Sequence, residues 1–216
     1  MSSPVAVSPL LLGVFAKWPE PGRAKTRLIP LLGEEGAARA AKRLLLRSLH
    51  WIDACPPHVR AVLWADGGTV GDWLDLLGTL ERPQRWQLQP QSSGHLGLRM
   101  RDAMQWQLDL LGSPACSLIM GTDTPTLGYQ HVQSVCKELQ THDAVFVPAL
   151  DGGYVMVGMG CVCEPAFGAL AWGSSQVAEQ TRAALDGGGF SHAWLKPEPD
   201  LDEPADWEAA VQAGWV

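Results

Sequence analysis

Short, continuously apolar runs alternate along this chain with longer segments whose apolar residues recur at helical spacing. Residues 10–16 and 116–120 are two of the apolar runs, and their length favours strands that are buried on both faces of a sheet. Residues 34–54 and 95–111 are two of the longer segments, and they are typical of helices with one buried face. Strand and helix signals in this alternation predict an α/β fold with a mostly parallel sheet.

The alternation continues to the end of the chain without a low-complexity linker, so we expect a single domain over residues 1–216. The predicted strands cover residues 10–16, 59–65, 85–89, 116–120, 144–148, 154–159 and 192–195. The predicted helices cover residues 34–54, 71–78, 95–111, 129–140, 175–186 and 204–213. Residues 17–33 contain three prolines and two glycines, and they are predicted to form a long loop.

Composition and charge argue against several classes of protein. Apolar residues make up 46% of the chain and charged residues 18%, which argues against a disordered chain. No apolar stretch reaches the roughly 18 to 20 residues of a membrane span. The net charge of −7 argues against a nucleic-acid partner. Five cysteines, an odd number without CxxC spacing, are expected to be reduced thiols in a cytoplasmic protein.

The first 47 residues carry eight basic side chains and three acidic ones, although the chain as a whole is acidic. Four of these bases lie in the loop that follows the first predicted strand. Ligands of open α/β sheets bind beyond the carboxyl ends of the strands. Glycine in this loop would let backbone amides approach a phosphate, and Lys and Arg would supply charged hydrogen bonds. The loop is a candidate phosphate-binding segment, with a plain basic surface loop as the alternative; its residues of interest are Lys17, Gly22, Arg23, Lys25 and Arg27.

Carboxylates follow two further predicted strands and gather near the C-terminus. Asp123 comes directly after the strand over 116–120, where it could bind Mg²⁺ or Mn²⁺ or cap the next helix. Asp151 precedes Gly152 and Gly153, which are typical of a hairpin turn or of a surface on which a ligand lies. The C-terminal acids form either a solvated turn before the last helix or, through one member, a metal site with Asp123; they are Glu198, Asp200, Asp202, Glu203, Asp206 and Glu208.

The start of the helix over 95–111 is a further candidate for ligand binding. Gly94 and Arg99 lie at this start, where free backbone amides favour an anion or a nucleobase carbonyl. Nucleophilic catalysis finds little support, because the chain has no GxSxG motif and its six histidines are scattered.

Several of these segments together resemble one known family. The sequence FAKWPEPGRAKTRL is similar to the opening signature of the DUF2064 proteins, which are relatives of nucleotide-diphospho-sugar transferases with a GT-A fold. The likeness continues in order through GHLGLRM, IMGTDTPTL, VPALDGGYVMVGM, AWGSSQV and DLDEPADW, over about residues 11–208. The opening signature and the DGGY segment are its most specific parts.

The resemblance implies a three-layer α/β/α sandwich with a mixed central sheet. It also implies a divalent metal, Mg²⁺ or Mn²⁺, held by Asp123 and by an Asp near the C-terminus that corresponds to Asp202. Three residues depart from the usual pattern of the family. His95 and Thr126 each stand where an Asp is usual, and Glu203 replaces a usual Thr. These departures bear on nucleotide or acceptor preference, while the carboxylates for the metal are retained.

The function implied is a metal-dependent transferase, of the glycosyltransferase kind, that uses a nucleotide-diphospho-sugar and an unknown small-molecule acceptor. Lys25 and Arg27 would neutralise the phosphates with support from Lys17, and Asp151 would orient or deprotonate the acceptor. Relatives that make nucleotide-activated cofactors suggest an alternative, in which a phosphorylated acceptor attacks an NTP and pyrophosphate leaves. A second alternative is a nucleotide-binding protein with a degenerate site.

Overall fold

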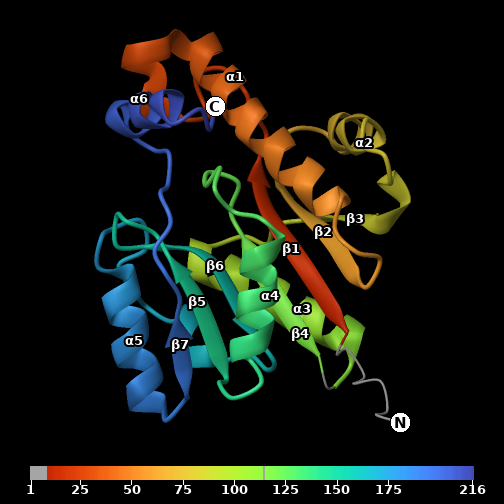
Figure 1. The fold of residues 1–216 in the computed structure, drawn as a ribbon, viewed down its shortest axis with the longest axis vertical. Coiled ribbons are helices and arrows are strands. Elements are labelled where there is room, and N and C mark those ends of the chain that lie inside the picture. Colours follow the sequence, from red (N-terminus) through yellow and green to blue (C-terminus); the bar gives the residue numbers. More distant parts are fainter. Residues whose placement is uncertain (1–8, 114) are drawn as a thin grey trace.

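The computed structural model describes residues 9–113 and 115–216, and its strands join one seven-stranded sheet (Figure 1). The strand order is β3-β2-β1-β4-β6-β5-β7. The strands are β1 (Leu10–Lys17), β2 (Val59–Asp66), β3 (Trp86–Pro90), β4 (Cys116–Met120), β5 (Ala144–Pro148), β6 (Tyr154–Met159) and β7 (His192–Trp194). Only β6 runs antiparallel to its neighbours, β4 and β5. The predicted α/β fold with a mostly parallel, mixed sheet is therefore confirmed.

The described residues form six α-helices, of which five cover the two faces of this sheet and the sixth in chain order packs against the first. They are α1 (Ile29–Asp53), α2 (Val70–Gly78), α3 (Leu96–Leu111), α4 (Tyr129–Glu138), α5 (Val177–Gly188) and α6 (Pro204–Gln212). Helices α1, α2 and α4 pack on one face, and α3 and α5 pack on the other (Figure 1). Each face of the sheet therefore has its own apolar layer. Along β1, Leu10 and Leu12 point into the first apolar layer, on the side of α1, and Leu11 points into the second, on the side of α3. The three-layer α/β/α sandwich is confirmed.

The predicted loop over residues 17–33 is shorter than expected. A short 3₁₀ turn covers Thr26–Leu28, and α1 begins at Ile29 rather than near residue 34. Pro30 is tolerated in the first turn because its missing N–H would have no partner inside the helix. Gly33 then takes a φ of 70°, which breaks the helical path and kinks α1. Pro30 and Gly33 are also two of the residues for which the sequence predicts a loop over this segment.

The Asp151-Gly152-Gly153 segment forms the turn of a β-hairpin between β5 and β6. The register of the hairpin shifts between Val147 and Pro148, which bends the strand just before the turn.

All five cysteines are free thiols, as expected. Within the described residues, no helix is both long and apolar enough to cross a membrane.

Helix α2 begins with a reciprocal cap that allows a test of its stability. The Thr69 hydroxyl accepts a hydrogen bond from the amide of Asp72, whose carboxylate accepts one from the amide of Thr69. We expect Thr69→Ala to lower the free energy of unfolding by about 1 kcal/mol in urea denaturation, because both bonds are disturbed. Thr69→Ser keeps the hydroxyl and is the matched control. Equal stabilities of the Ala and Ser variants would contradict this role for the cap.

Candidate active site

The loop after β1 brings one lysine to the carboxyl end of the sheet. The amide of Trp18 donates a hydrogen bond to the carbonyl of Asp66 at 2.7 Å, and this bond holds the start of the loop against the end of β2. It turns back where the amide of Ala24 donates to the carbonyl of Glu20 at 3.0 Å. Lys25 then takes a left-handed conformation with a φ of 46°, the one positive φ outside glycine in the described part of the chain. Such conformations are uncommon for residues with a side chain and gather at functional sites.

The segment between β7 and α6 crosses the same edge of the sheet (Figure 1). The amide of Glu198 donates to the carbonyl of Pro148 at 2.9 Å, and the amide of Leu201 donates to the carbonyl of Asp123 at 3.1 Å. Leu201 is also buried against Leu44 of α1. These contacts fix Asp200 and Asp202 opposite the loop that follows β1.

Lys25 lies at the centre of the candidate site. Its Nζ lies 2.7 Å from Oδ1 of Asp202 and 3.0 Å from Oδ1 of Asp123, and it donates to the carbonyl of Leu201 at 2.6 Å. The lysine side chain is 6% exposed, while those of Asp123 and Asp202 are 42% and 39% exposed. The ammonium is therefore buried and the carboxylates are open to a ligand.

The electrostatics of this cluster shift two pKa values. Burial by itself would lower the pKa of Lys25, but the charges of Asp123, Asp202 and Asp200 outweigh it and hold the pKa above its ordinary value. Burial, followed by the charge of Asp123, raises the pKa of Asp200 to about 7 against the opposing effect of Lys25. Asp123 and Asp202 together hold one more negative charge than Lys25 neutralises, and Arg27, at 3.6 Å from Asp202, is the second cation near them.

A cavity of about 440 Å³ opens between the loop after β1 and the ends of β1, β2 and β4. The predicted residues Lys17, Lys25, Arg27, Arg99 and Asp123 line this first cavity together with Asp202. Arg99 is positioned at its wall by hydrogen bonds to the carboxylate of Asp66 at 3.3 Å and the side-chain oxygen of Gln91 at 3.2 Å. The lining of the first cavity therefore combines cations with carboxylates.

A second cavity of about 390 Å³ adjoins the first, and Arg27 and Asp202 line both. Arg27 lies 3.6 Å from Oδ2 of Asp202 and 3.3 Å from Oε1 of Glu203. Asp151 lines the second cavity, and its Oδ1 accepts a hydrogen bond from the amide of Gly153 at 2.9 Å. The remaining charged lining is acidic and consists of Asp200, Asp202, Glu203 and Asp206.

Four predicted glycines do not line either cavity. Gly22 and Gly94 take positive φ values of 73° and 106° in turns. Gly152 lies against the backbone of Ser175, and Gly153 holds the carboxylate of Asp151. Each of these glycines lies at the turn of a loop, and neighbouring residues of the same loop supply side chains to the cavity lining. The glycines themselves lie outside the lining.

The structure shows which residues cap α4 and α3. Gly128, rather than Asp123, is the cap of α4, so the capping interpretation of Asp123 is wrong. His95 is the cap of α3, where its Nδ1 accepts a hydrogen bond from the amide of Leu98. Its ring also stacks on Trp172 with 6.1 Å between centroids. This capping accounts for His95 without any ligand.

Sequence reasoning assigned no specific role to three residues of the site. Asp66 and Gln91 lie in the first cavity beside Arg99, and Asp200 lies beside the Lys25 cluster. The available sequence signal for Asp66 was its position at the end of β2, directly before two glycines. Asp200 was one of six nearby acids, and their spacing alone does not distinguish those that face the sheet.

The residues of the cluster fit a divalent cation by the chemistry of their donors. Two carboxylate oxygens and one backbone carbonyl oxygen already surround a single positive centre, the Nζ of Lys25. Oxygen donors of this kind are the ligands that Mg²⁺ prefers. In the described residues no three His, Cys, Asp or Glu side chains stand ready-arranged around a metal position. A metal at Asp123 and Asp202 would therefore require the ammonium of Lys25 to move aside.

Comparison with solved structures places this fold among nucleotide-handling transferases. A protein from Desulfovibrio desulfuricans G20, provisionally named a nucleotide-diphospho-sugar transferase, is 26% identical with a TM-score of 0.85, over 96% of this chain and 88% of that one. The 4-diphosphocytidyl-2C-methyl-D-erythritol synthase of Anaerococcus prevotii has a TM-score of 0.61 at 9% identity, covering 96% and 97%. The CMP:2-keto-3-deoxy-manno-octonic acid synthetase, complexed with CTP, has a TM-score of 0.55 at 11% identity, covering 97% and 100%. The last two likenesses show the fold alone.

No curated protein matches the chain. A family model described as "Uncharacterized protein conserved in bacteria" matches residues 54–174, which is more than half of the chain. The matched segment includes Asp123 and Asp151 but not the loop with Lys25 or the segment with Asp202. The chain therefore belongs to the DUF2064 family.

Proposed function

We propose that this protein is a metal-dependent transferase that binds a nucleotide-diphospho-sugar in the first cavity and transfers the sugar to an acceptor in the second. The observation that carries the proposal is the contact of Lys25 with Asp123 in the first cavity and with Asp202, which lines both cavities where they adjoin. A reacting bond between a donor and an acceptor would lie at this junction.

The cations of the first cavity support the binding of a diphosphate. Lys17, Lys25, Arg27 and Arg99 all line this cavity. Charge-assisted hydrogen bonds from Lys and Arg are the strong contacts that proteins make to phosphate oxygens. The D. desulfuricans relative, by its name a nucleotide-diphospho-sugar transferase, supports the same class of donor.

Asp123 and Asp202 would hold Mg²⁺ or Mn²⁺, with the carbonyl of Leu201 close by. When bound, the metal supplies positive charge that neutralises phosphate oxygens of the leaving nucleoside diphosphate. Lys25, displaced from the carboxylates, would turn its ammonium toward the phosphates, whose negative charge favours its protonated form. Arg27, which lines both cavities, would then orient the donor at the junction.

The acidic second cavity supports a neutral or cationic acceptor over a phosphorylated one. Asp151, Glu203 and Asp206 face this cavity in addition to the carboxylates of the junction, and Arg27 is its one cationic lining residue. A phosphate monoester would meet several carboxylates of the same sign. This observation favours sugar transfer to a hydroxyl over attack by a phosphorylated acceptor. Asp151, held by the Gly153 amide, would accept the hydrogen bond of that hydroxyl.

Nucleotidyl transfer is the second candidate, because the fold also occurs in the cytidylyl-transferring proteins named above. In that reaction a phosphorylated acceptor attacks an NTP and pyrophosphate leaves. The charge of the second cavity argues against such an acceptor, whereas the first cavity would bind an NTP and a nucleotide sugar by the same contacts.

The experiment that tests the proposal incubates the protein with Mn²⁺ and a panel of UDP-, GDP- and ADP-sugars, or with a panel of NTPs and sugar phosphates. We expect release of a free nucleoside diphosphate from one nucleotide sugar. Release of pyrophosphate from an NTP would favour the second candidate. If neither product forms and no nucleotide shifts the melting temperature in the presence of Mn²⁺, the protein is not a transferase of this class. Chelation with EDTA should abolish turnover and is the control for the metal.

A further inference from the structure

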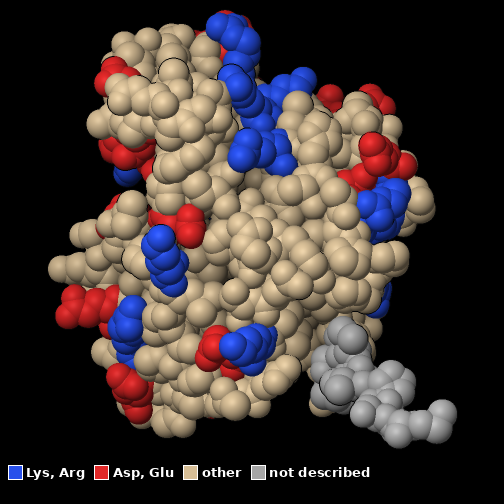
Figure 2. Space-filling model, in the orientation of Figure 1, with Lys and Arg blue, Asp and Glu red and all other residues tan. Residues whose placement is uncertain are grey.

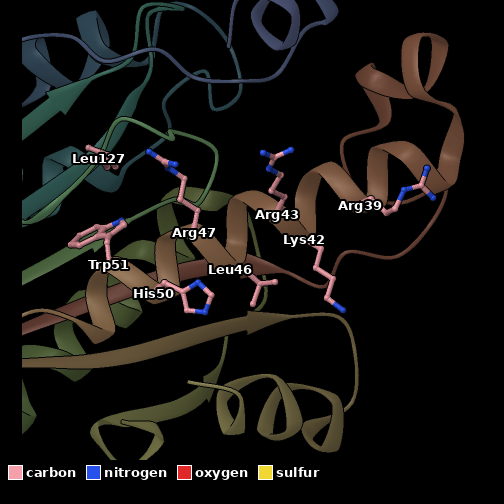
Figure 3. Close-up of a pocket in the computed structure, with 8 residues that line it drawn as sticks. All are labelled: Arg39, Lys42, Arg43, Leu46, Arg47, His50, Trp51 and Leu127. Carbon is pink, nitrogen blue, oxygen red and sulfur yellow. The ribbon is translucent and has the colours of Figure 1, made fainter. Parts of the chain in front are cut away.

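A basic groove lies along the exposed face of α1, away from the two cavities of the candidate active site. Its volume is about 700 Å³, and it shares no lining residue with either of those cavities. Figure 2 shows Lys and Arg side chains gathered over α1. The residues of the groove are Arg39, Lys42, Arg43, Leu46, Arg47, His50, Trp51 and Leu127 (Figure 3).

The charges of this basic groove are not neutralised within the protein. No carboxylate in the described residues lies within 4.0 Å of the charged groups of Arg39, Lys42, Arg43 or Arg47. Arg39 and Arg43, and Arg43 and Arg47, are four residues apart on the helix, where like charges repel. A chain with a net charge of −7 thus keeps four unpaired cations together on one helix. An anion bound here would relieve the repulsion.

The apolar part of the groove suits a ring. Trp51 and Leu46 pack against the first apolar layer and are partly exposed, and Leu127 is buried beside them. In Figure 3, Arg43 and Arg47 point to the side of α1 on which Leu127 lies, and Trp51 follows them one turn further along the helix. Small-molecule sites combine an apolar floor with a few polar groups in this way, and the volume lies within their usual range.

The spacing of the arginines along the helix suits a chain of phosphates. Arg39 and Arg47 are eight residues apart, which is about 12 Å along a helix. One phosphate cannot reach both, whereas a diphosphate or triphosphate contacts two neighbouring guanidinium groups. Guanidinium groups bind phosphate oxygens in pairs, which suits Arg better than Lys for this contact. The ligand class is therefore an aromatic ring joined to a phosphate chain.

The groove also touches the loop that carries Asp123. The Nε of Arg47 donates to the carbonyl of Pro125 at 2.7 Å, and Leu127 belongs to the same loop. An anion bound to Arg47 would thus contact the side chain whose hydrogen bond holds this loop, and the anion itself would lie outside the active site.

We propose that the basic groove is a second binding site, for a nucleoside polyphosphate. The proposal does not depend on the transfer reaction, and its failure would leave the proposed function unaffected.

The test uses 8-azido-ATP as a photoreactive probe on the full chain in the absence of divalent metal, with peptide mapping of the labelled positions. We expect labelling of residues 46–51 or 125–128. The double variant R39Q/R43Q should reduce that labelling at least tenfold, while labelling of the loop over residues 17–28 stays unchanged. Lys137→Gln removes one charge from an exposed site on α4 and is the control, with no expected effect on labelling. Circular dichroism checks that the variants keep their helices.

Competition experiments distinguish the sources of the phosphate chain. Inorganic tripolyphosphate should reduce the labelling of α1, and ATP should do so at concentrations at least tenfold lower if the ring contributes through Trp51 and Leu127. Labelling confined to the loop over residues 17–28, or equal labelling of α1 in R39Q/R43Q and the unmodified protein, would overturn the proposal. Displacement by a poly-glutamate peptide as effective as that by ATP would also overturn it, in favour of an acidic protein partner.

Discussion

Replacement of Lys25 by Met is expected to lower kcat/KM for the transfer reaction by about 100-fold to 1000-fold, the effect typical of removing one preorganised electrostatic contact. Lys25 is the buried positive group of the site, and its Nζ lies 2.7 and 3.0 Å from the carboxylates of Asp202 and Asp123. Met has a similar length and no charge, so the change removes the proposed contact to the donor phosphates without emptying the space. Steady-state kinetics with the nucleotide sugar identified by the panel would measure the effect.

The same variant makes a second, separable prediction about stability. Without Lys25, the carboxylates of Asp123, Asp200 and Asp202 lose their common counter-charge, and we expect the melting temperature to fall. Mg²⁺ should then stabilise Lys25→Met more than it stabilises the unmodified protein, because no ammonium competes for the carboxylates. Lys25→Arg, which keeps the charge, is the control. Activity within threefold of the unmodified protein, or a stabilisation by Mg²⁺ no larger than before, would contradict the role given to Lys25.

Replacement of Gly152 by Ala is expected to lower the free energy of unfolding by more than about 2 kcal/mol. A Cβ at residue 152 would lie 2.1 Å from the carbonyl oxygen of Ser175, a backbone atom that cannot turn aside, and the φ of Gly152 is 94°. The hairpin and the loop around Ser175 must therefore move apart, and both contribute to the wall of the second cavity. Urea denaturation would measure the loss of stability.

Gly173→Ala is the matched control for this change. Gly173 also has a positive φ, of 82°, and lies in the same loop as Ser175, but a Cβ there would meet nothing within 4 Å. Its cost should be limited to the backbone conformation, at about 1 kcal/mol. Equal losses for the two variants would show that close approach to Ser175 does not matter.

The order and type of the elements were predictable because strands buried on both faces have a clear apolar signature. All seven predicted strands and six predicted helices are present, and the polar segments after β1, β4 and β5 do meet at one edge. Parallel strands make this outcome general, since their carboxyl ends lie together. The antiparallel direction of β6 was not apparent from its apolar run alone; it depended on whether the Asp151-Gly152-Gly153 segment was a hairpin turn, which the structure shows it to be.

The identity of the residues around Lys25 was less predictable. A run of six acids near the C-terminus contains two that lie in the Lys25 cluster, and the hydrogen bond from Leu201 to the carbonyl of Asp123 decides which two. The four cations of α1 were equally ambiguous, because a solvated helix face and a lined groove share one sequence pattern. Only the loop carrying Leu127, which packs beside them, separates the two interpretations.

The junction of the cavities draws its charged groups from positions 177 residues apart, Lys25 and Asp202. During synthesis from the N-terminus, the sheet edge with β1, β2 and β4 can therefore form while the site still lacks its second carboxylate. Until the segment after β7 is added, Lys25 has only Asp123 as an ion-pair partner in the cluster. The arrangement of Lys25 against both carboxylates is then completed late, as a final step of assembly that follows the formation of most of the core.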